Sequence, residues 1–340
     1  MDKASLEKFD SQGMHKIYDI WPEIAKESYE RKNEKIRFNE ISHIVFAGMG
    51  GSGAIGDIFE AILSKTNIHV TLVKGYHLPN TVDSKTLVVV TSISGNTVEA
   101  LSVLESAIQT DAKVIAFSSG GEMEKICLKN SLEYRKIEMK HSPRVSFPIF
   151  LYSMLKILES VLPIKKEDIE ESILELEKTK ENIQSKNLTE KNIALNIAKQ
   201  IIGIPLIYYP WGLQAAAIRF KNSLQENTKM HAITEDVIEA CHNGIVAWDE
   251  KSNVNPILIQ GTDDYIKTKE RWKILKELFK EKNIEYNEIY SKKGNILSKI
   301  INLIYVLDYS TIYKAVLLGI DPTPVGPINF VKNKLKIETS

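Results

Sequence analysis

Cysteine is scarce in this chain of 340 residues, which contains only Cys127 and Cys241. The two lie far apart and lack the short spacing of metal ligands, which argues against a disulfide framework and favours a reducing compartment. An excess of either charge is also lacking, because 44 Lys and Arg balance 44 Asp and Glu. A neutral chain has no electrostatic footprint for nucleic acid or an anionic membrane, so a charged ligand must be recognised locally.

Long apolar runs are absent as well. The N-terminal segment is charged and has no apolar leader, and no later segment has eighteen uninterrupted apolar residues. We therefore expect a cytoplasmic protein that does not insert into a membrane. A content of 43% hydrophobic and 26% charged residues describes an ordinary globular chain. Its length predicts two domains of about 150 residues each.

The stretch TLVVVTSISGNTVEAL, residues 86–101, is the strongest local signal. It opens with an apolar, β-branched run typical of a buried parallel strand, and a helical pattern begins at Val98. Hydroxyl side chains fill the turn between them, together with Gly95 and Asn96. In a parallel α/β sheet such a turn directs N–H groups and hydroxyls at a ligand above the carboxyl edge. Because no Lys follows it, the turn favours one phosphate monoester over a polyphosphate.

A second loop, GMGGSG at residues 48–53, lies between a predicted strand and a predicted helix. Its glycines fit the G-x-G-x-x-G pattern of dinucleotide sites, which also needs an acid about 20 residues later. Residues 73–76, Val-Lys-Gly-Tyr, supply no such acid. A tight turn without a ligand would explain one glycine but not four. We expect instead that the glycines let the backbone approach a sugar phosphate, with Ser52 adding a hydroxyl.

Strands and helices alternate along most of the chain, which predicts right-handed crossovers and parallel sheets. The first 38 residues have the rhythm of one or two amphipathic helices, with Ile17, Ile20, Trp21 and Ile24 on one face. The domains we expect are N-terminal helices at 1–38, a first sheet domain at 39–164, a helical linker at 165–200, and a second sheet domain with a C-terminal tail at 201–340. The predicted strands are 41–47, 68–73, 86–91, 113–117, 133–138, 204–209, 256–260 and 284–289.

The second half repeats the pattern of the first, which suggests internal duplication. The segment ILIQGTDDY, residues 257–265, is then the counterpart of the phosphate turn. In it Asp263 and Asp264 replace the hydroxyls, and two carboxylates would repel a phosphate. They lack the His or Glu neighbours of a divalent metal site. Only the first half should therefore hold the anion.

The loops GMGGSG and TSISGNT resemble those of the sugar isomerase (SIS) domain family. The segments RFKNSLQENTK at 219–229, EACHNG at 239–244 and DPTPVGPINFVK at 321–332 are similar to the bifunctional phosphoglucose/phosphomannose isomerases of archaea and some bacteria. The resemblance covers residues 40–335 and implies an α/β fold class, with two SIS-type (flavodoxin-like) parallel-sheet domains of three layers each. Ile93 departs from it, because the family often has Tyr there, and we expect this side chain to point away from the phosphate.

The resemblance also implies roles for individual residues. It implies that two loops hold the substrate phosphate through Gly51, Ser52, Ser92, Ser94 and Thr97. It implies a catalytic base, a ring-opening histidine, an arginine beside the enediolate and a lysine from the tail, which are Glu226, His242, Arg144 and Lys332. It further implies a hexose 6-phosphate substrate, a place in glycolysis and gluconeogenesis, and a homodimer with the active site at the subunit interface.

The chemistry of aldose–ketose isomerisation needs these residue types. Moving one proton between C2 and C1 through a cis-enediol requires a carboxylate over that edge, and Glu226 is the candidate. A histidine that titrates near neutrality suits ring opening, and the proline-flanked Arg144 suits the charge that develops on the enediolate. Each has an ordinary alternative as a solvated side chain, most of all Lys332 in its Lys-rich tail. No metal or organic cofactor is required.

Several functions remain open at this point. We favour an isomerase that interconverts glucose 6-phosphate, and mannose 6-phosphate as well, with fructose 6-phosphate. A noncatalytic sugar-phosphate sensor would bind the same ligands, but it normally carries a DNA-binding helix-turn-helix, which we do not find in residues 1–38. A nicotinamide enzyme would need the missing acid. An SIS isomerase of an aminosugar or heptose phosphate is the close competitor.

Overall fold

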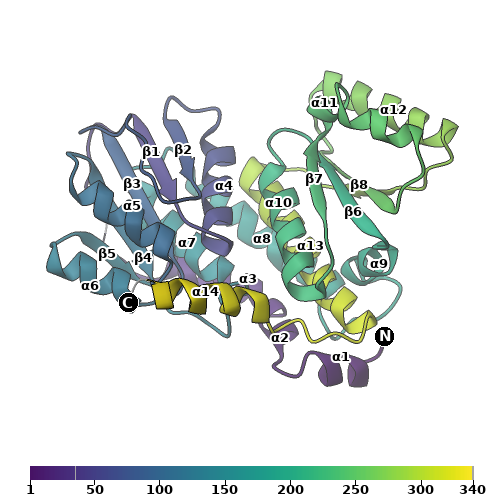
Figure 1. Cartoon of the computed structure of the whole chain (residues 1–340), viewed down its shortest axis with the longest axis horizontal. Coiled ribbons are helices and arrows are strands. Elements are labelled where there is room, and N and C mark those ends of the chain that lie inside the picture. The colour runs from purple at the N-terminus through teal and green to yellow at the C-terminus, as the bar shows by residue number, and fades with distance from the viewer. Residues whose placement is uncertain (35, 339–340) are drawn as a thin grey trace.

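The computed structural model describes residues 1–34 and 36–338, the last three of these by their backbone only. Two parallel sheets stand side by side, with helices between them and on their outer faces (Figure 1). Each sheet thus forms the middle layer of three. The predicted fold class, α/β with two three-layer parallel-sheet domains, is confirmed.

The first sheet has five parallel strands in the order β2-β1-β3-β4-β5, which is the flavodoxin-like order. Alternate residues of a strand face opposite layers. Val88 packs with α5 and α6, whereas Leu87 packs with α4 and α7. The elements are β1 His43–Ala47, β2 His69–Val73, β3 Thr86–Ser92, β4 Lys113–Ser118, β5 Glu133–Lys136, α4 Gly51–Leu63, α5 Val98–Ile108, α6 Gly121–Lys129 and α7 Phe147–Ile157.

The second sheet has four parallel strands in the order β7-β6-β8-β9. This order repeats that of β2, β1, β3 and β4, so β8 stands where β3 stands in the first sheet, as the predicted duplication requires. The predicted strands are confirmed to within three residues, but the short β7 and the helix α7 were missed. The elements are β6 Ile204–Tyr209, β7 Ile233–Asp236, β8 Val254–Gln260, β9 Asn287–Tyr290, α10 Gln214–Ser223, α11 Val237–Ala240, α12 Ile266–Glu281 and α13 Ile296–Leu317.

The N-terminal segment forms three short helices, not the one or two predicted, because Gly13 turns the chain with a φ of +70°. Ile20 does not share the apolar face, since it is 38% exposed, whereas Trp21 is buried. The indole of Trp21 donates to the carbonyl oxygen of Val145 (3.0 Å) and stacks on Tyr305, so these helices connect the two lobes. They are α1 Lys3–Phe9, α2 Met14–Tyr18 and α3 Trp21–Glu30.

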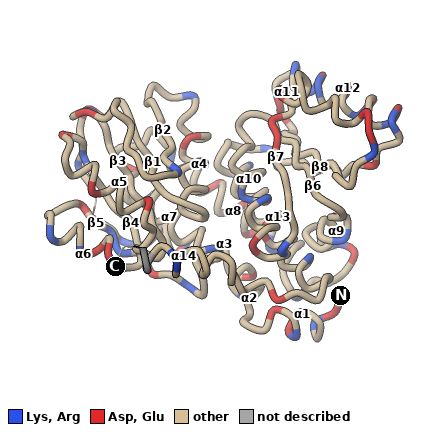
Figure 2. The backbone as a smooth tube through the Cα atoms, in the orientation of Figure 1, with Lys and Arg blue, Asp and Glu red and all other residues tan. Residues whose placement is uncertain are grey.

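The segment at 165–200 forms α8 Lys166–Ile183 and α9 Ile193–Gln200, which pack on α13. Their apolar residues belong to the core cluster that runs through both lobes, and the charged face is solvated. Helix α13 is long and apolar enough to cross a membrane, but 94% of its apolar window is buried inside the protein, as for a core helix. Positively charged residues, Lys and Arg, and negatively charged residues, Asp and Glu, are mixed over both lobes (Figure 2).

Candidate active site

The turn after β3 carries the predicted phosphate-binding hydroxyls, and hydrogen bonds within the turn fix their positions. Ser92 is buried and donates to Thr97 Oγ1 (2.9 Å), so Ser92 folds the turn and leaves the hydrogen of Thr97 free. Ser94 accepts from the Asn96 amide (3.4 Å) and also keeps its own hydrogen. Gly95 has a φ of +72°, and a Cβ on it would lie 1.7 Å from the carbonyl oxygen of Gly120. The turn therefore offers two hydroxyl donors held by a fixed backbone.

The glycine loop meets this turn through Ser52. The Ser52 hydroxyl accepts from the Ile93 amide (3.3 Å), which leaves its hydrogen available to a ligand. The N-caps of α4 and α5, Gly50 and Thr97, make no side-chain capping bond. Two uncapped helix N-termini thus lie at one edge of the sheet, an arrangement that favours an anion. Ile93 is buried in the core, and its Cδ1 would lie 3.8 Å from a Cβ on Gly51, so this side chain borders the glycine loop.

The end of β2 argues against a dinucleotide. Lys74 stands at the position where an acid should hold the ribose, and its ammonium pairs with Asp57 of α4. Burial raises the pKa of Asp57 in spite of this pairing. A lysine tied to a buried carboxylate does not recognise ribose hydroxyls as the missing acid would.

Arg144 and Glu226 come together from the two halves of the chain. Nε of Arg144 lies 3.3 Å from Oε2 of Glu226. The side chain of Arg144 is 10% exposed, whereas that of Glu226 is 27% exposed. Glu226 stands within a π-helical turn, Leu224–Thr228, that ends α10, and such turns are common at functional sites. One carboxylate oxygen is held by a cation, and Oε1 has no bonded partner among the described residues.

Three further groups fix the Arg144 guanidinium. Nη1 donates to Asn227 Oδ1 (2.7 Å) and to the Pro322 carbonyl (3.1 Å), and Nη2 donates to the Thr323 carbonyl (2.7 Å). Nζ of Lys229 donates to the carbonyl oxygens of Glu226 (2.6 Å) and Pro322 (3.3 Å). Desolvation, and then the nearby Arg144, lower the pKa of Lys229. The segment after α13 is therefore tied to both partners of the pair.

The phosphate loops and the Arg144–Glu226 pair belong to one region. A Cβ on Gly51 would lie 3.8 Å from the carbonyl oxygen of Pro143, the residue before Arg144, and 3.7 Å from Nη1 of Arg219 in α10. Figure 1 shows α4 and α10 side by side between the sheets. The structure thus brings together the anion loops of the first lobe and the acid of the second.

His242 lies away from this region in the same chain. It is exposed in the turn after α11, beyond the carboxyl end of β7. Helix α10 begins at the neighbouring edge, after β6, and runs back along the sheet. At about 1.5 Å per residue, Glu226 is roughly 18 Å further along than Gln214. The histidine and the glutamate therefore stand at opposite ends of the second lobe.

Lys332 is exposed on the last helix, α14 Gly326–Glu338. In the view of Figure 1, α14 extends from the second lobe across to the first. The lysine lies on the segment that continues from Pro322 and Thr323. The structure brings together Arg144, Glu226 and the phosphate loops, but not His242.

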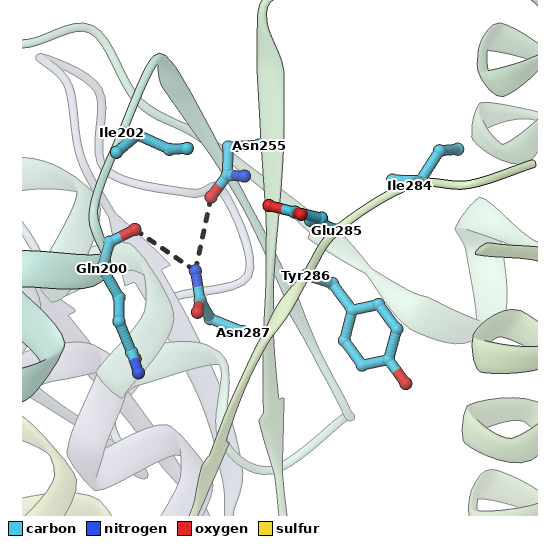
Figure 3. A pocket seen from close by; sticks show the side chains of 7 residues that line it. All are labelled: Gln200, Ile202, Asn255, Ile284, Glu285, Tyr286 and Asn287. Atoms are coloured by element: carbon cyan, nitrogen blue, oxygen red, sulfur yellow. Dashed lines mark hydrogen bonds between the residues drawn. The ribbon is translucent and has the colours of Figure 1, made fainter. Parts of the chain in front are cut away.

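A hollow of about 520 Å³ lies elsewhere, at the amino ends of β8 and β9. Figure 3 shows that its polar contacts join Asn287 to Asn255 and to the backbone of Gln200. Glu285 is its one ionisable acid, and no cation faces it from the lining. The residues that line this hollow include no convergent catalytic groups.

Comparison with known proteins shows the family of the chain. The SIS domain family matches residues 37–156, and the family described as the bacterial phospho-glucose isomerase C-terminal SIS domain matches residues 190–335. A bifunctional phosphoglucose/phosphomannose isomerase of Caldicellulosiruptor bescii is 32% identical over 331 residues, which cover 94% of this chain and 97% of that protein. The chain belongs to the bifunctional phosphoglucose/phosphomannose isomerase family.

Two other proteins are similar to this isomerase. A hypothetical protein of Thermus thermophilus with a crystal structure superposes with a TM-score of 0.74, covering 99% of this chain and 93% of that one at 14% identity, and it supports the fold alone. A D-glucosamine-6-phosphate 4-epimerase of Sulfolobus acidocaldarius is 27% identical over 239 residues, which cover 70% of this chain and 74% of that protein.

Sequence reasoning missed three residues that hold the site of this isomerase together. They are Arg219, Asn227 and Lys229, and all lie in the RFKNSLQENTK segment. Arg219 lies in α10 and Glu226 in the π-helical turn that follows it, so the spacing of an ordinary α-helix does not relate the two. The contacts of Asn227 and Lys229 depend on the chain's return at Pro322, which no local pattern indicates.

Proposed function

We propose that this enzyme interconverts glucose 6-phosphate, and mannose 6-phosphate, with fructose 6-phosphate. The contact between Arg144 and Glu226 carries the proposal, because it combines a base and a cation at the junction of the lobes. The family membership of the whole chain supports the same substrates.

The residues divide the reaction between them. The free Oε1 of Glu226 takes the proton from C2 of the aldose and returns it to C1. Arg144, fixed by Asn227 and the Pro322 carbonyl, stabilises the charge that builds on the enediolate oxygens. Rotation of the enediol about C2–C3 presents its other face, which allows mannose 6-phosphate as well.

The phosphate is held without a full positive charge in the loops themselves. Ser52, Ser94 and Thr97 donate through hydroxyl hydrogens that none of the described residues accepts, and Gly51 presents the N-terminus of α4. Ser92 contributes by fixing Thr97. A monoester dianion accepts several such bonds at once, which orients C1 and C2 towards Glu226.

His242 and the tail complete the proposal. Because His242 stands at the far end of its own lobe, we propose that it serves the site of a second subunit in a cytoplasmic homodimer, where it opens the sugar ring. Lys332 acts from α14 on the substrate's open-chain form. Burial of the one cysteine and partial burial of the other support a reducing compartment.

The test of the base compares Glu226→Gln with Glu277→Gln, a change of an exposed acid on α12. We expect the first variant to lose isomerisation and solvent-deuterium exchange at C2 while still binding an inhibitor, and the second to match wild type. Glucose 6-phosphate, mannose 6-phosphate and glucosamine 6-phosphate are assayed side by side. Near-wild-type turnover by Glu226→Gln rejects the assignment.

The test of the shared site mixes Glu226→Gln with His242→Asn after subunit exchange. If His242 acts across the interface, each mixed dimer has one intact site, and activity returns to about a quarter of wild type. If both residues act within one chain, no mixture recovers activity.

A second candidate substrate is an aminosugar phosphate. The D-glucosamine-6-phosphate 4-epimerase relative favours it, and both candidates use the same phosphate loops. Turnover of glucosamine 6-phosphate without turnover of either hexose 6-phosphate would select this function instead.

A further inference from the structure

The GMGGSG loop contains four glycines, and the physical reason for glycine differs from one position to the next. A Cβ on Gly48 would lie 2.9 Å from the Thr91 carbonyl oxygen, and one on Gly53 would lie 2.9 Å from the Gly48 carbonyl oxygen. Gly50 has a φ of +55°. The fold therefore requires these three, and the expectation that Gly48 and Gly53 approach a sugar is corrected, since both approach protein backbone.

Gly51 has no such cause. Its φ is outside the left-handed region, and the nearest atoms to a Cβ would be 3.7–3.8 Å away, which is ordinary van der Waals contact. An alanine would fit the empty protein without strain. The missing side chain thus leaves a small space at the first turn of α4, bordered by Nη1 of Arg219, Cδ1 of Ile93 and the carbonyl oxygen of Pro143.

Arg219 reaches this space from the second lobe with a fixed direction. Its Nε and Nη2 both donate to Asp308 Oδ2 (2.9 and 2.7 Å), and Nη2 also donates to the Arg144 carbonyl (2.8 Å). The guanidinium lies 4.0 Å from the ring centre of Phe147. Asp308 is fully buried and held by Ser223 (2.7 Å). These bonds fix the position of the guanidinium. Of its three nitrogens, only Nη1 has no hydrogen-bond partner among the described residues.

We propose that Arg219 is a substrate-contacting residue whose Nη1 binds the phosphate end of the substrate in the space that Gly51 keeps open. This inference rests on the proposed function, because it takes the loops as the phosphate site. The loops carry no cation of their own, and the nearby Lys74 is occupied by Asp57. Arg219 therefore adds a charge-assisted donor, which is stronger than a neutral hydroxyl.

The experiment measures the affinity for inorganic phosphate and sorbitol 6-phosphate by calorimetry, and kcat and KM for fructose 6-phosphate. Arg219→Lys keeps the charge but cannot hold Asp308 and reach the space together, so we expect both ligands to bind about tenfold more weakly. A phosphate contact is made equally in the ground and transition states. KM should therefore rise, while kcat stays within about threefold of the wild-type value. Gly51→Ala should weaken the binding of both ligands to the same extent as Arg219→Lys, and its melting temperature should equal that of the wild type.

Ser223→Ala is the matched control. It removes a bond to Oδ1 of the same Asp308, whereas Arg219 binds Oδ2, and it should leave phosphate affinity within about twofold. An equal loss in this variant, or a loss of kcat alone in Arg219→Lys, would mean that Arg219 only supports the fold around Arg144. Unchanged phosphate affinity in Arg219→Lys and Gly51→Ala also overturns the proposal.

Two further measurements keep the outcome decisive. If Arg219→Lys does not fold, a crystal of the wild-type protein with sorbitol 6-phosphate decides, since a phosphate oxygen within about 3 Å of Nη1 supports the contact and one beyond about 5 Å rejects it. If wild type binds phosphate through Arg219 but isomerises nothing, the proposed function fails while this contact stands.

Discussion

Asn227 offers the sharpest prediction about how the base and the cation are held in place. Its side chain is completely buried, with Oδ1 accepting from Arg144 (2.7 Å) and Nδ2 donating to Thr311 Oγ1 (2.8 Å). Asn227→Ala removes a hydrogen bond to a charged group, which contributes about 1.5–3 kcal/mol, and leaves a small cavity that costs about 1 kcal/mol more. We expect a loss of about 2–4 kcal/mol in the free energy of unfolding.

The same substitution should lower kcat more than it changes KM. Without Asn227 the guanidinium of Arg144 loses one of its fixed partners, and a shift of about 1 Å relative to the enediolate costs up to roughly a hundredfold in rate. Phosphate binding depends on other residues, so KM should stay within about threefold. Urea unfolding gives the stability, and steady-state kinetics with fructose 6-phosphate give the two constants.

Asn222→Ala on the same helix is the matched control, since no hydrogen bond or ion pair of Asn222 is found among the described residues. It should change stability by less than about 0.5 kcal/mol. If Asn227→Ala is destabilised but keeps its full kcat, Asn227 supports the fold without positioning Arg144. If it resembles the control in both measurements, the buried contacts described here are not formed in solution.

Three other predictions concern the fold. Gly95→Ala should lower the free energy of unfolding by about 2–5 kcal/mol and abolish phosphate affinity, because Gly95 has a φ of +72° and a Cβ there would collide with a backbone carbonyl. Gly75→Ala, which has open space around the new methyl group, should change the free energy of unfolding in urea very little. Burial opposes ionisation of Asp10, but the hydrogen bonds from His15 outweigh it and lower the Asp10 pKa below 3.8. Ionised Asp10 therefore stabilises the folded protein above about pH 4, and this stabilisation is lost as the pH falls through the lowered pKa. The loss of unfolding free energy in Asp10→Asn should accordingly become smaller below about pH 4. A loss that does not change with pH would refute this cause. Burial raises the pKa of Cys127 to about 11, so a thiol reagent at pH 8 should label it only after unfolding.

The anchor stretch at residues 86–101 was readable from sequence because its signals are local. Apolar β-branched residues next to one another favour a buried strand, and the hydroxyl-rich turn before Val98 follows from residue type alone. The same holds for the spacing of strands along the chain, which led to the confirmed architecture. The missed β7 has four residues and the half-exposed pattern of an edge strand, so its local signal was weak.

Motif resemblance pointed to Arg144 and Glu226 without indicating how they meet. Their contact joins α10 to a loop 82 residues earlier and to the chain's return at Pro322. Periodicity carries no information on such separations, because it reports only neighbours along the chain. The role of Ser92 was likewise hidden, since its burial and its bond to Thr97 depend on the folded turn.

The sequence by itself determined the alternation of strands and helices, the two loops and the residue types that isomerisation requires. Local sterics and hydrophobic spacing set these features, and both act over a few residues. The tertiary structure alone decided that Gly51 faces Arg219, that Asn227 holds Arg144, and that His242 lies at the far end of its lobe from Glu226. Such relations arise when packing of the shared core fixes the two lobes against each other, because only then do side chains distant in sequence gain definite distances.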